Sequence, residues 1–128
     1  MGRIVASVRI ENALAAEQGL SCDALVDTGA SLMVLPKAWK DRFGKFISER
    51  LVERQTATQT TVTGELCGPV RIQLAGFAAI YNEVLFVDMQ PADGLYEPLI
   101  GYIVLEQCQA AVDMVGHRLL HAKAMDLK

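Results

Sequence analysis

The sequence predicts a mainly β fold with one or two short helices, and three observations lead to this class. The chain has 128 residues, which suits one compact domain, 1–128, with a substantial core. Several short segments alternate apolar and polar side chains with period two, as strands with one buried face do. Glycines separate these segments along the chain. Short strands at such spacing are typical of a β-barrel or a sandwich.

The first two strands are expected near the N-terminus. Residues 4–10 alternate apolar and polar side chains and predict an opening strand, after which we expect a turn around Gly19. The apolar segment 22–27 predicts a second, short strand that Gly29 ends. This strand therefore carries an aspartate at its C-terminal end.

A short helix is expected next, over residues 36–44. Pro36 is suited to the start of a helix, the segment has an apolar side, and Gly44 follows it. Its cations could indicate an anion site, but a solvated helix face is the simpler interpretation. These cations are Lys37, Lys40, Arg42 and Lys45.

A threonine-rich segment follows the helix. Five of the eight residues from Thr56 to Thr63 are threonine, which suits strands but is too polar for a core. We therefore expect an exposed hairpin, with breaks in the strand at Gly64 and Gly68.

Two more strands are expected after this hairpin. Residues 70–74 alternate, and residues 84–87 form a short apolar run, with turns expected at Gly76 and beside Asn82. The following segment, 89–98, is expected to be a loop. The C-terminal part then predicts one short helix after Gly101 and a last hairpin that turns near Gly116.

Composition and charge exclude several classes of function. The chain is 52% hydrophobic and 21% charged, which is a globular composition. Its formal net charge of −3 gives no long-range attraction for nucleic acid or for anionic lipid, so neither is expected as a partner. Arg3, Arg9 and Glu11 interrupt the apolar residues of the N-terminal segment, so we do not expect it to be a secretory signal. The apolar runs are of strand length, and we do not expect one that crosses a membrane. We expect a soluble, cytoplasmic protein.

The cysteines and histidines do not form a recognisable metal or disulfide pattern. Cys22, Cys67 and Cys108 are widely spaced and lack a C-x-x-C pair, so we interpret them as small buried hydrophobic residues. His117 and His121 could share one face of a strand, but a third ligand is not evident at motif spacing. Neither a metal nor another cofactor is expected.

The segment Asp27-Thr28-Gly29 ends the second predicted strand and is the strongest candidate for a functional site. The three residues alone are weak evidence, because an aspartate can simply start a turn and glycine tolerates the conformation that follows. Their context is more informative. Apolar residues precede the aspartate, Val-Leu-Pro follows, and Leu99-Ile100-Gly101 comes about 70 residues later, leading into a second Val-Leu pair.

With these segments in order, the chain resembles the retropepsin-like aspartic proteases, the single-domain family that includes the retroviral enzymes and small bacterial proteases. The resemblance extends from about Val8 to Leu119. It is carried by Leu25-Val26-Asp27-Thr28-Gly29-Ala30-Ser31, Val34-Leu35-Pro36, Gly64, Val70, Leu99-Ile100-Gly101, Leu105-Glu106, Val112-Asp113 and Arg118-Leu119.

The resemblance implies a closed, retropepsin-like β-barrel that is active as a two-fold symmetric homodimer and cleaves peptide or protein substrates. Asp27 would be the catalytic residue. The surrounding scaffold would consist of Thr28, Gly29, Leu99, Ile100 and Gly101, with Thr28 bonded to its twin in the partner copy. The threonine-rich hairpin would be a flap over the substrate. Substrate-binding residues would be Ala30, Ser31, Thr58, Gln59 and Thr60.

The chemistry of such a site requires two carboxylates. One ionised aspartate accepts a proton from water, and one protonated aspartate donates a proton to the scissile carbonyl, as is known for aspartic proteases. The two share one proton, because like charges a few ångströms apart are costly. Thr-Gly follows only Asp27 among the aspartates of this chain, and Ser-Gly follows none. The second carboxylate is therefore expected from another copy across a two-fold axis.

Two alternatives stay open. The chain could be a catalytically silent retropepsin-like domain that binds peptide or protein, because its hairpin tip, Ala57-Thr58-Gln59, departs from the glycine-bearing tip of many small relatives. It could also be a structural β-barrel in which Asp-Thr-Gly occurs by coincidence. In that case Asp27 would find its partners within one chain.

Overall fold

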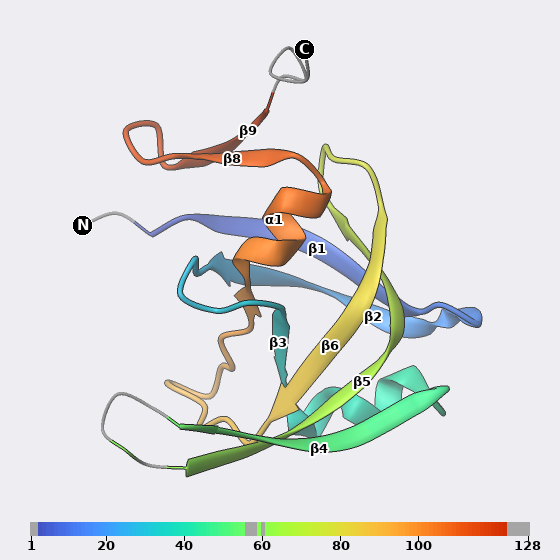
Figure 1. Cartoon of the computed structure of the whole chain (residues 1–128). Helices are drawn as coiled ribbons and strands as arrows, with labels where there is room; N and C mark the ends of the chain where they lie inside the picture. Colours follow the sequence, from blue (N-terminus) through green and yellow to red (C-terminus); the bar gives the residue numbers. More distant parts are fainter. Residues whose placement is uncertain (1–2, 56–58, 60, 123–128) are drawn as a thin grey trace.

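The computed structural model describes residues 3–55, 59 and 61–122, and the fold is mainly β (Figure 1). Most of the described strands belong to one large sheet, and a separate two-stranded sheet follows the α-helix near the C-terminus. In chain order the elements are β1 (Val5–Asn12), β2 (Ala15–Val26), β3 (Met33–Pro36), the 3₁₀ helix η1 (Lys37–Phe43), β4 (Ser48–Gln55), β5 (Thr61–Leu74), β6 (Ile80–Val87), β7 (Leu99–Ile100), α1 (Tyr102–Gln107), β8 (Ala110–Asp113) and β9 (Arg118–His121).

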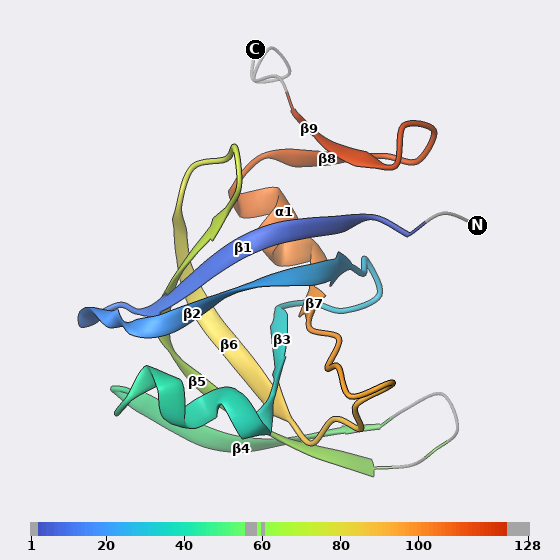
Figure 2. The same cartoon turned by 180° about the vertical axis from the view of Figure 1, so that it is seen from behind.

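The large sheet has the order β1-β2-β7-β3-β6-β5-β4, and β1 also pairs with β5. Strands β1 and β2 form an antiparallel hairpin, as do β4 and β5. By contrast, β2 and β7 pair in parallel, and so do β3 and β6. Figure 2 shows the short β7 between β2 and β3. This arrangement places segments that are distant in sequence next to the C-terminal end of β2.

The core lies between the strands and is closed on one side by η1. Phe43, at the end of η1, is fully buried. Its ring stacks with that of Phe46 at a centroid distance of 5.8 Å and meets the ring of Phe86 edge to face at 5.6 Å. Asn12 is the buried polar residue here, and its side-chain amide donates to the backbone oxygens of Phe43 and Lys45 at 2.9 and 2.8 Å. The 3₁₀ helix is therefore fixed to the rest of the fold by apolar and polar contacts.

Several expectations from the sequence are confirmed. The opening strand is β1, the segment 89–98 lacks a named strand or helix, the short helix after Gly101 is α1, and β8 and β9 form a hairpin around Gly116. The expected burial of the cysteines is confirmed for Cys67 and Cys108, whereas Cys22 is half-buried.

The expected turn around Gly19 is wrong. Gly19 lies inside β2, opposite Glu11, and the chain reverses earlier, between Asn12 and Ala15. A Cβ at Gly19 would lie 2.2 Å from the backbone oxygen of Ile10. The glycine therefore permits a close approach of two strands, beside an irregularity in the register, and does not form a turn.

The expected breaks at Gly64, Gly68 and Asn82 are also wrong. Both glycines lie within the single long strand β5, and β6 continues through Asn82. A Cβ at Gly64 would lie 2.8 Å from the side chain of Leu85, and one at Gly68 would lie 3.1 Å from the backbone of Glu83. Here too, glycine marks a close contact between strands, which a sequence pattern cannot distinguish from a turn.

The helix expected over 36–44 exists, but it is a 3₁₀ helix and its cations do not form a uniformly solvated face. Lys37 is exposed, whereas the side chain of Lys40 is 22% exposed and bonds to glutamates of β4 and β5. Within the described residues, the helices are all too short to cross a membrane.

Candidate active site

Asp27 directly follows β2, and backbone hydrogen bonds fix its position. Its N–H donates to the backbone oxygen of Ile100 at 3.0 Å, and the preceding Val26 N–H donates to Ile4 at 2.8 Å. The N–H of Leu25 donates to Pro98 at 2.9 Å. The apolar strand that carries the carboxylate is thus held between the N-terminal segment and β7, which leaves its backbone little freedom.

The turn after Asp27 is organised by the aspartate itself. The N–H of Gly29 donates to the Asp27 carboxylate oxygen Oδ1 at 2.9 Å, and the N–H of Ala30 donates to the Asp27 backbone oxygen at 3.1 Å. Asp27 is half-buried, Thr28 and Gly29 are exposed, and Ala30 is buried. The hydrogen bond from the backbone N–H of Gly29 orients the carboxyl group of Asp27 at the surface.

Gly101 packs the start of α1 against this turn. A Cβ at Gly101 would lie 2.3 to 2.4 Å from backbone atoms of Ser31 and Leu32. On the other side of this contact, the N–H of Tyr102 donates to Ala30 at 2.9 Å and the N–H of Ile103 donates to Ser31 at 2.9 Å. A side chain at position 101 would therefore separate the helix from the turn, which explains the need for glycine.

An apolar pocket adjoins the turn. It has a volume of about 250 Å³ and is lined by Ser31, Leu32, Val52, Leu66 and Leu85. These residues come from the turn after Asp27, from both arms of the β4–β5 hairpin and from β6. The pocket is suited to an apolar side chain next to the carboxylate.

The structure brings the predicted scaffold residues together. Thr28 and Gly29 follow Asp27 in the chain, and Ile100 accepts a hydrogen bond from the Asp27 N–H. Leu99 pairs with Leu25 of the preceding strand, and Gly101 packs against the same turn, which continues through Ala30 and Ser31. Of the three predicted residues at the hairpin tip, Thr58 and Thr60 lie outside the described residues. Gln59 is exposed and has a φ of 67°. The described ends of β4 and β5 extend to the same side of the molecule as the turn after Asp27 (Figures 1 and 2).

Sequence reasoning missed most of the pocket. It named Ser31 but not Leu32, Val52, Leu66 or Leu85, which complete the lining. In β4 the apolar residues Leu51 and Val52 are adjacent, so the sequence carries no period-two signal that would place Val52 on one face. The strand pairing places it: Val52 lies opposite Gly64, and Leu66 is two residues further along on the same face of β5.

The cysteines do not offer an alternative nucleophile. Burial raises the pKa of Cys22 and of Cys67 to about 11, and it also raises the pKa of Cys108. These thiols are therefore protonated near neutral pH, and a thiol is a much weaker nucleophile than a thiolate.

One cluster resembles a metal site among the residues that the structure describes. Ligand atoms of Glu49, Glu65 and Cys67 lie within 4.8 Å of one another. The ammonium group of Lys40, however, bonds to both carboxylates and supplies the positive charge that a cation would bring.

The comparisons with known proteins identify the fold. Neither the models of known protein families nor the curated proteins give a match to this sequence. Among solved structures, the chain is similar to the EIAV protease in complex with the inhibitor HBY-793, with a TM-score of 0.63 and 20% identity over 88% of this chain and 94% of that one. A Legionella pneumophila protein of unknown function is 16% identical over 92% of this chain and 94% of that one, with a TM-score of 0.47. The first likeness shows that this chain has the fold of a retroviral protease.

Proposed function

We propose that this protein is an aspartic endopeptidase that works as a homodimer, with Asp27 of each copy as the catalytic residue. One observation carries the proposal. In a chain with a retroviral-protease fold, Asp27 lies at the end of β2, is half-buried, and is fixed through its backbone to Ile100 and through its carboxylate to Gly29. A carboxylate held in one orientation at the surface is what acid–base catalysis requires.

The dimer follows from the chemistry. Peptide hydrolysis by carboxylates needs one ionised and one protonated group close together, and the pair shares a single proton. Asp27 alone among the aspartates of the sequence precedes Thr-Gly, so the second carboxylate comes from the partner's copy of the same residue. Thr28 lies next to Asp27 and is exposed in the single chain. Its side chain is therefore accessible for a contact with the same loop of the partner copy. In the same proposal, the two pairings of β1 close the large sheet into a barrel.

The substrate is a peptide or protein segment in an extended conformation. An apolar side chain of the substrate occupies the pocket beside Ser31, and the backbone of Ala30 and Ser31 lies along the substrate. The β4–β5 hairpin, which carries Gln59 and the undescribed Thr58 and Thr60, acts as the flap. A closed flap excludes water and adds hydrogen bonds to the substrate backbone.

Cleavage of an unstructured protein by the purified dimer tests the proposal. Wild-type activity is expected to be sensitive to pepstatin, to fall on both sides of an optimum on the acid side of neutrality, and to disappear in Asp27→Asn. Asp41→Asn is the matched control, because Asp41 is an exposed carboxylate on η1 and its loss should leave activity unchanged. Cleavage by Asp27→Asn would refute the assignment. Tight peptide binding by a wild-type protein that does not cleave would instead support the catalytically silent domain.

A further inference from the structure

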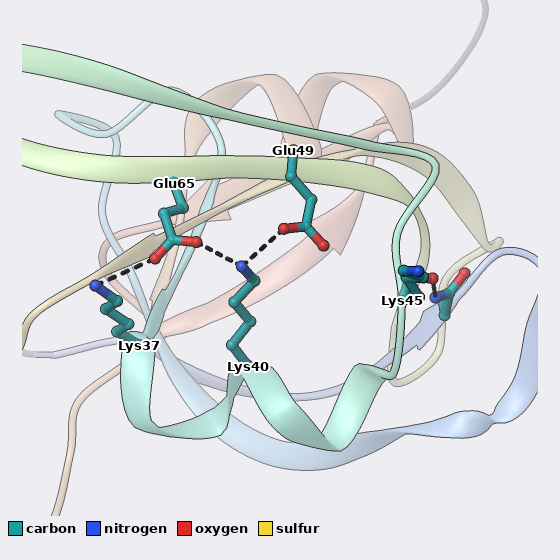
Figure 3. A network of polar contacts seen from close by, with 6 residues as sticks. Lys37, Lys40, Lys45, Glu49 and Glu65 are labelled. Atoms are coloured by element: carbon teal, nitrogen blue, oxygen red, sulfur yellow. Dashed lines mark hydrogen bonds and ion pairs between the residues drawn. The ribbon is translucent and has the colours of Figure 1, made fainter.

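Four charged residues connect η1 to the stem of the β4–β5 hairpin (Figure 3). The ammonium nitrogen of Lys40 lies 2.5 Å from Oε1 of Glu65 and 2.9 Å from Oε1 of Glu49. Lys37 lies 3.2 Å from the other oxygen of Glu65. We call these four residues the Lys40 network. It joins one helix to both arms of the hairpin, in which β4 is an edge strand of the large sheet and β5 pairs with β6.

The register of the hairpin explains why a cation is needed there. Glu49 is opposite Cys67, and Glu65 is opposite Leu51, so the two glutamates are diagonal neighbours on the same face of β4 and β5. Two carboxylates at this spacing repel each other unless a positive charge lies between them. Lys40 is in that position, with its side chain 22% exposed and that of Glu65 17% exposed. Partial burial makes this contact stronger than an exposed surface ion pair.

The other face of the same strands lines the apolar pocket. Leu66 follows Glu65 in β5, and successive side chains of a strand point to opposite faces. Leu66 and Val52 of β4 both line the pocket beside Ser31. The position of the strands therefore affects the Lys40 network on one face and the width of the pocket on the other.

The helix η1, which carries Lys40, is connected along the chain to the turn after Asp27. The turn after Asp27 continues directly into β3, and β3 continues into η1 without a loop. Because Phe43 is fully buried, η1 is fixed to the core. Lys40 is thus attached to an element that is fixed to the core and continuous with the turn carrying the carboxylate, and it bonds to the hairpin that completes the pocket.

We propose that Lys40 is a positioning residue that holds the β4–β5 stem against η1 and so sets the distance of Val52 and Leu66 from Ser31 and Leu32. The inference rests on the proposed function for its effect on substrate. Its structural part, the attachment of the hairpin stem, does not. Lys40 affects binding of an apolar substrate side chain and leaves the chemical step at Asp27 unchanged.

Amide hydrogen exchange measures the structural part without any need for activity. In Lys40→Met, amides of β4 and β5 near Glu49 and Glu65 should exchange about fivefold to tenfold faster, and Lys40→Arg should restore the wild-type rates. Arg50→Met is the matched control, because Arg50 is 57% exposed and joins β4 to Glu83 of β6 at 3.2 Å. It should change these rates less than about twofold. Unchanged exchange in a folded Lys40→Met would overturn the proposal.

Kinetics measure the effect on substrate. For a peptide with an apolar side chain, KM of Lys40→Met should rise about threefold to tenfold while kcat stays within about twofold, and Lys40→Arg should recover most of the loss. Glu65→Gln keeps an acceptor oxygen but loses the charge, so its KM should lie between those of the wild type and Lys40→Met. This variant replaces Lys40→Met in the test if Lys40→Met does not fold. Faster exchange with an unchanged KM would refute the link to the pocket. A wild-type protein without cleavage would refute the proposed function, and the exchange result would still decide the role of Lys40 in the hairpin.

Discussion

Replacing Gly101 by alanine should damage the fold much more than the size of one methyl group suggests. The backbone at Gly101 has φ −84° and ψ 169°, which any residue adopts without strain. The cost is therefore steric. The new Cβ would lie 2.3 Å from the carbonyl carbon of Ser31 and 2.4 Å from the backbone oxygens of Ser31 and Leu32. Backbone atoms cannot rotate away as a side chain can, so the helix and the turn must separate.

The magnitude follows from what this separation removes. Overpacking at a closely packed position costs about 1–3 kcal/mol. The hydrogen bonds from Tyr102 to Ala30 and from Ile103 to Ser31 cross the same contact, and each contributes about 1 kcal/mol. Together these losses come to about 3–5 kcal/mol, a large part of the roughly 5–15 kcal/mol that stabilises a typical domain.

Urea unfolding at equilibrium measures the effect. Gly76→Ala is the control, because a Cβ at Gly76 meets nothing within 4 Å and the cost there is the strain of a φ of 89°. That strain is about 1–2 kcal/mol. If Gly101→Ala loses less stability than Gly76→Ala, or lies within about 1 kcal/mol of the wild type, the packing of α1 against the turn after Asp27 is wrong.

Two further predictions concern the dimer and acid stability. Thr28→Ala should weaken the dimer by about 2 kcal/mol, or about thirtyfold in dissociation constant, because the proposed hydrogen bond to the twin loop occurs twice. Sedimentation at falling protein concentration measures the dissociation constant. An unchanged dissociation constant would show that Thr28 does not contact the twin loop. The hydrogen bonds from Lys40 lower the pKa of Glu65 and of Glu49 below the ordinary value of 4.5. Their contribution to stability is therefore present above that pH and is lost as pH falls through the lowered pKa values, whereas Lys40, whose pKa is raised, loses its contribution only in strong alkali. The melting temperature should fall more for wild type than for Glu65→Gln between about pH 6 and about pH 3, and equal falls would show that the network contributes nothing.

The candidate site was predictable where it depends on residues that are close in sequence. The turn after Asp27 is a local structure, since Gly29 and Ala30 donate to the aspartate itself. The Leu-Ile-Gly segment was predictable because the residue type is restricted at both Ile100 and Gly101. Strand pairing and burial restrict position 100, and the backbone of the turn restricts position 101. Both segments therefore carry narrow residue requirements that a single sequence displays.

The missed features depend on partners that are distant in sequence. Gly19 and Gly64 resemble turn residues until the opposite strand is known, because both a turn and a close contact favour glycine. Lys40 resembles a solvated cation until Glu49 and Glu65 arrive from a hairpin 9 and 25 residues away. In each case the register of the strands determines which residues become neighbours, and the register is known only from the folded chain.

The parallel pairing of β2 with β7 also constrains when, during synthesis and folding, the position of Asp27 can be fixed. The N–H of Asp27 finds its acceptor on Ile100, so the carboxylate lacks its final support until most of the chain has been synthesised and the non-local pairing has formed. Contacts of this separation form late and slowly in folding. A nascent chain that ends before Ile100 should therefore show fast amide exchange at Asp27, and this exchange should slow only when the segment that contains Ile100 has been added.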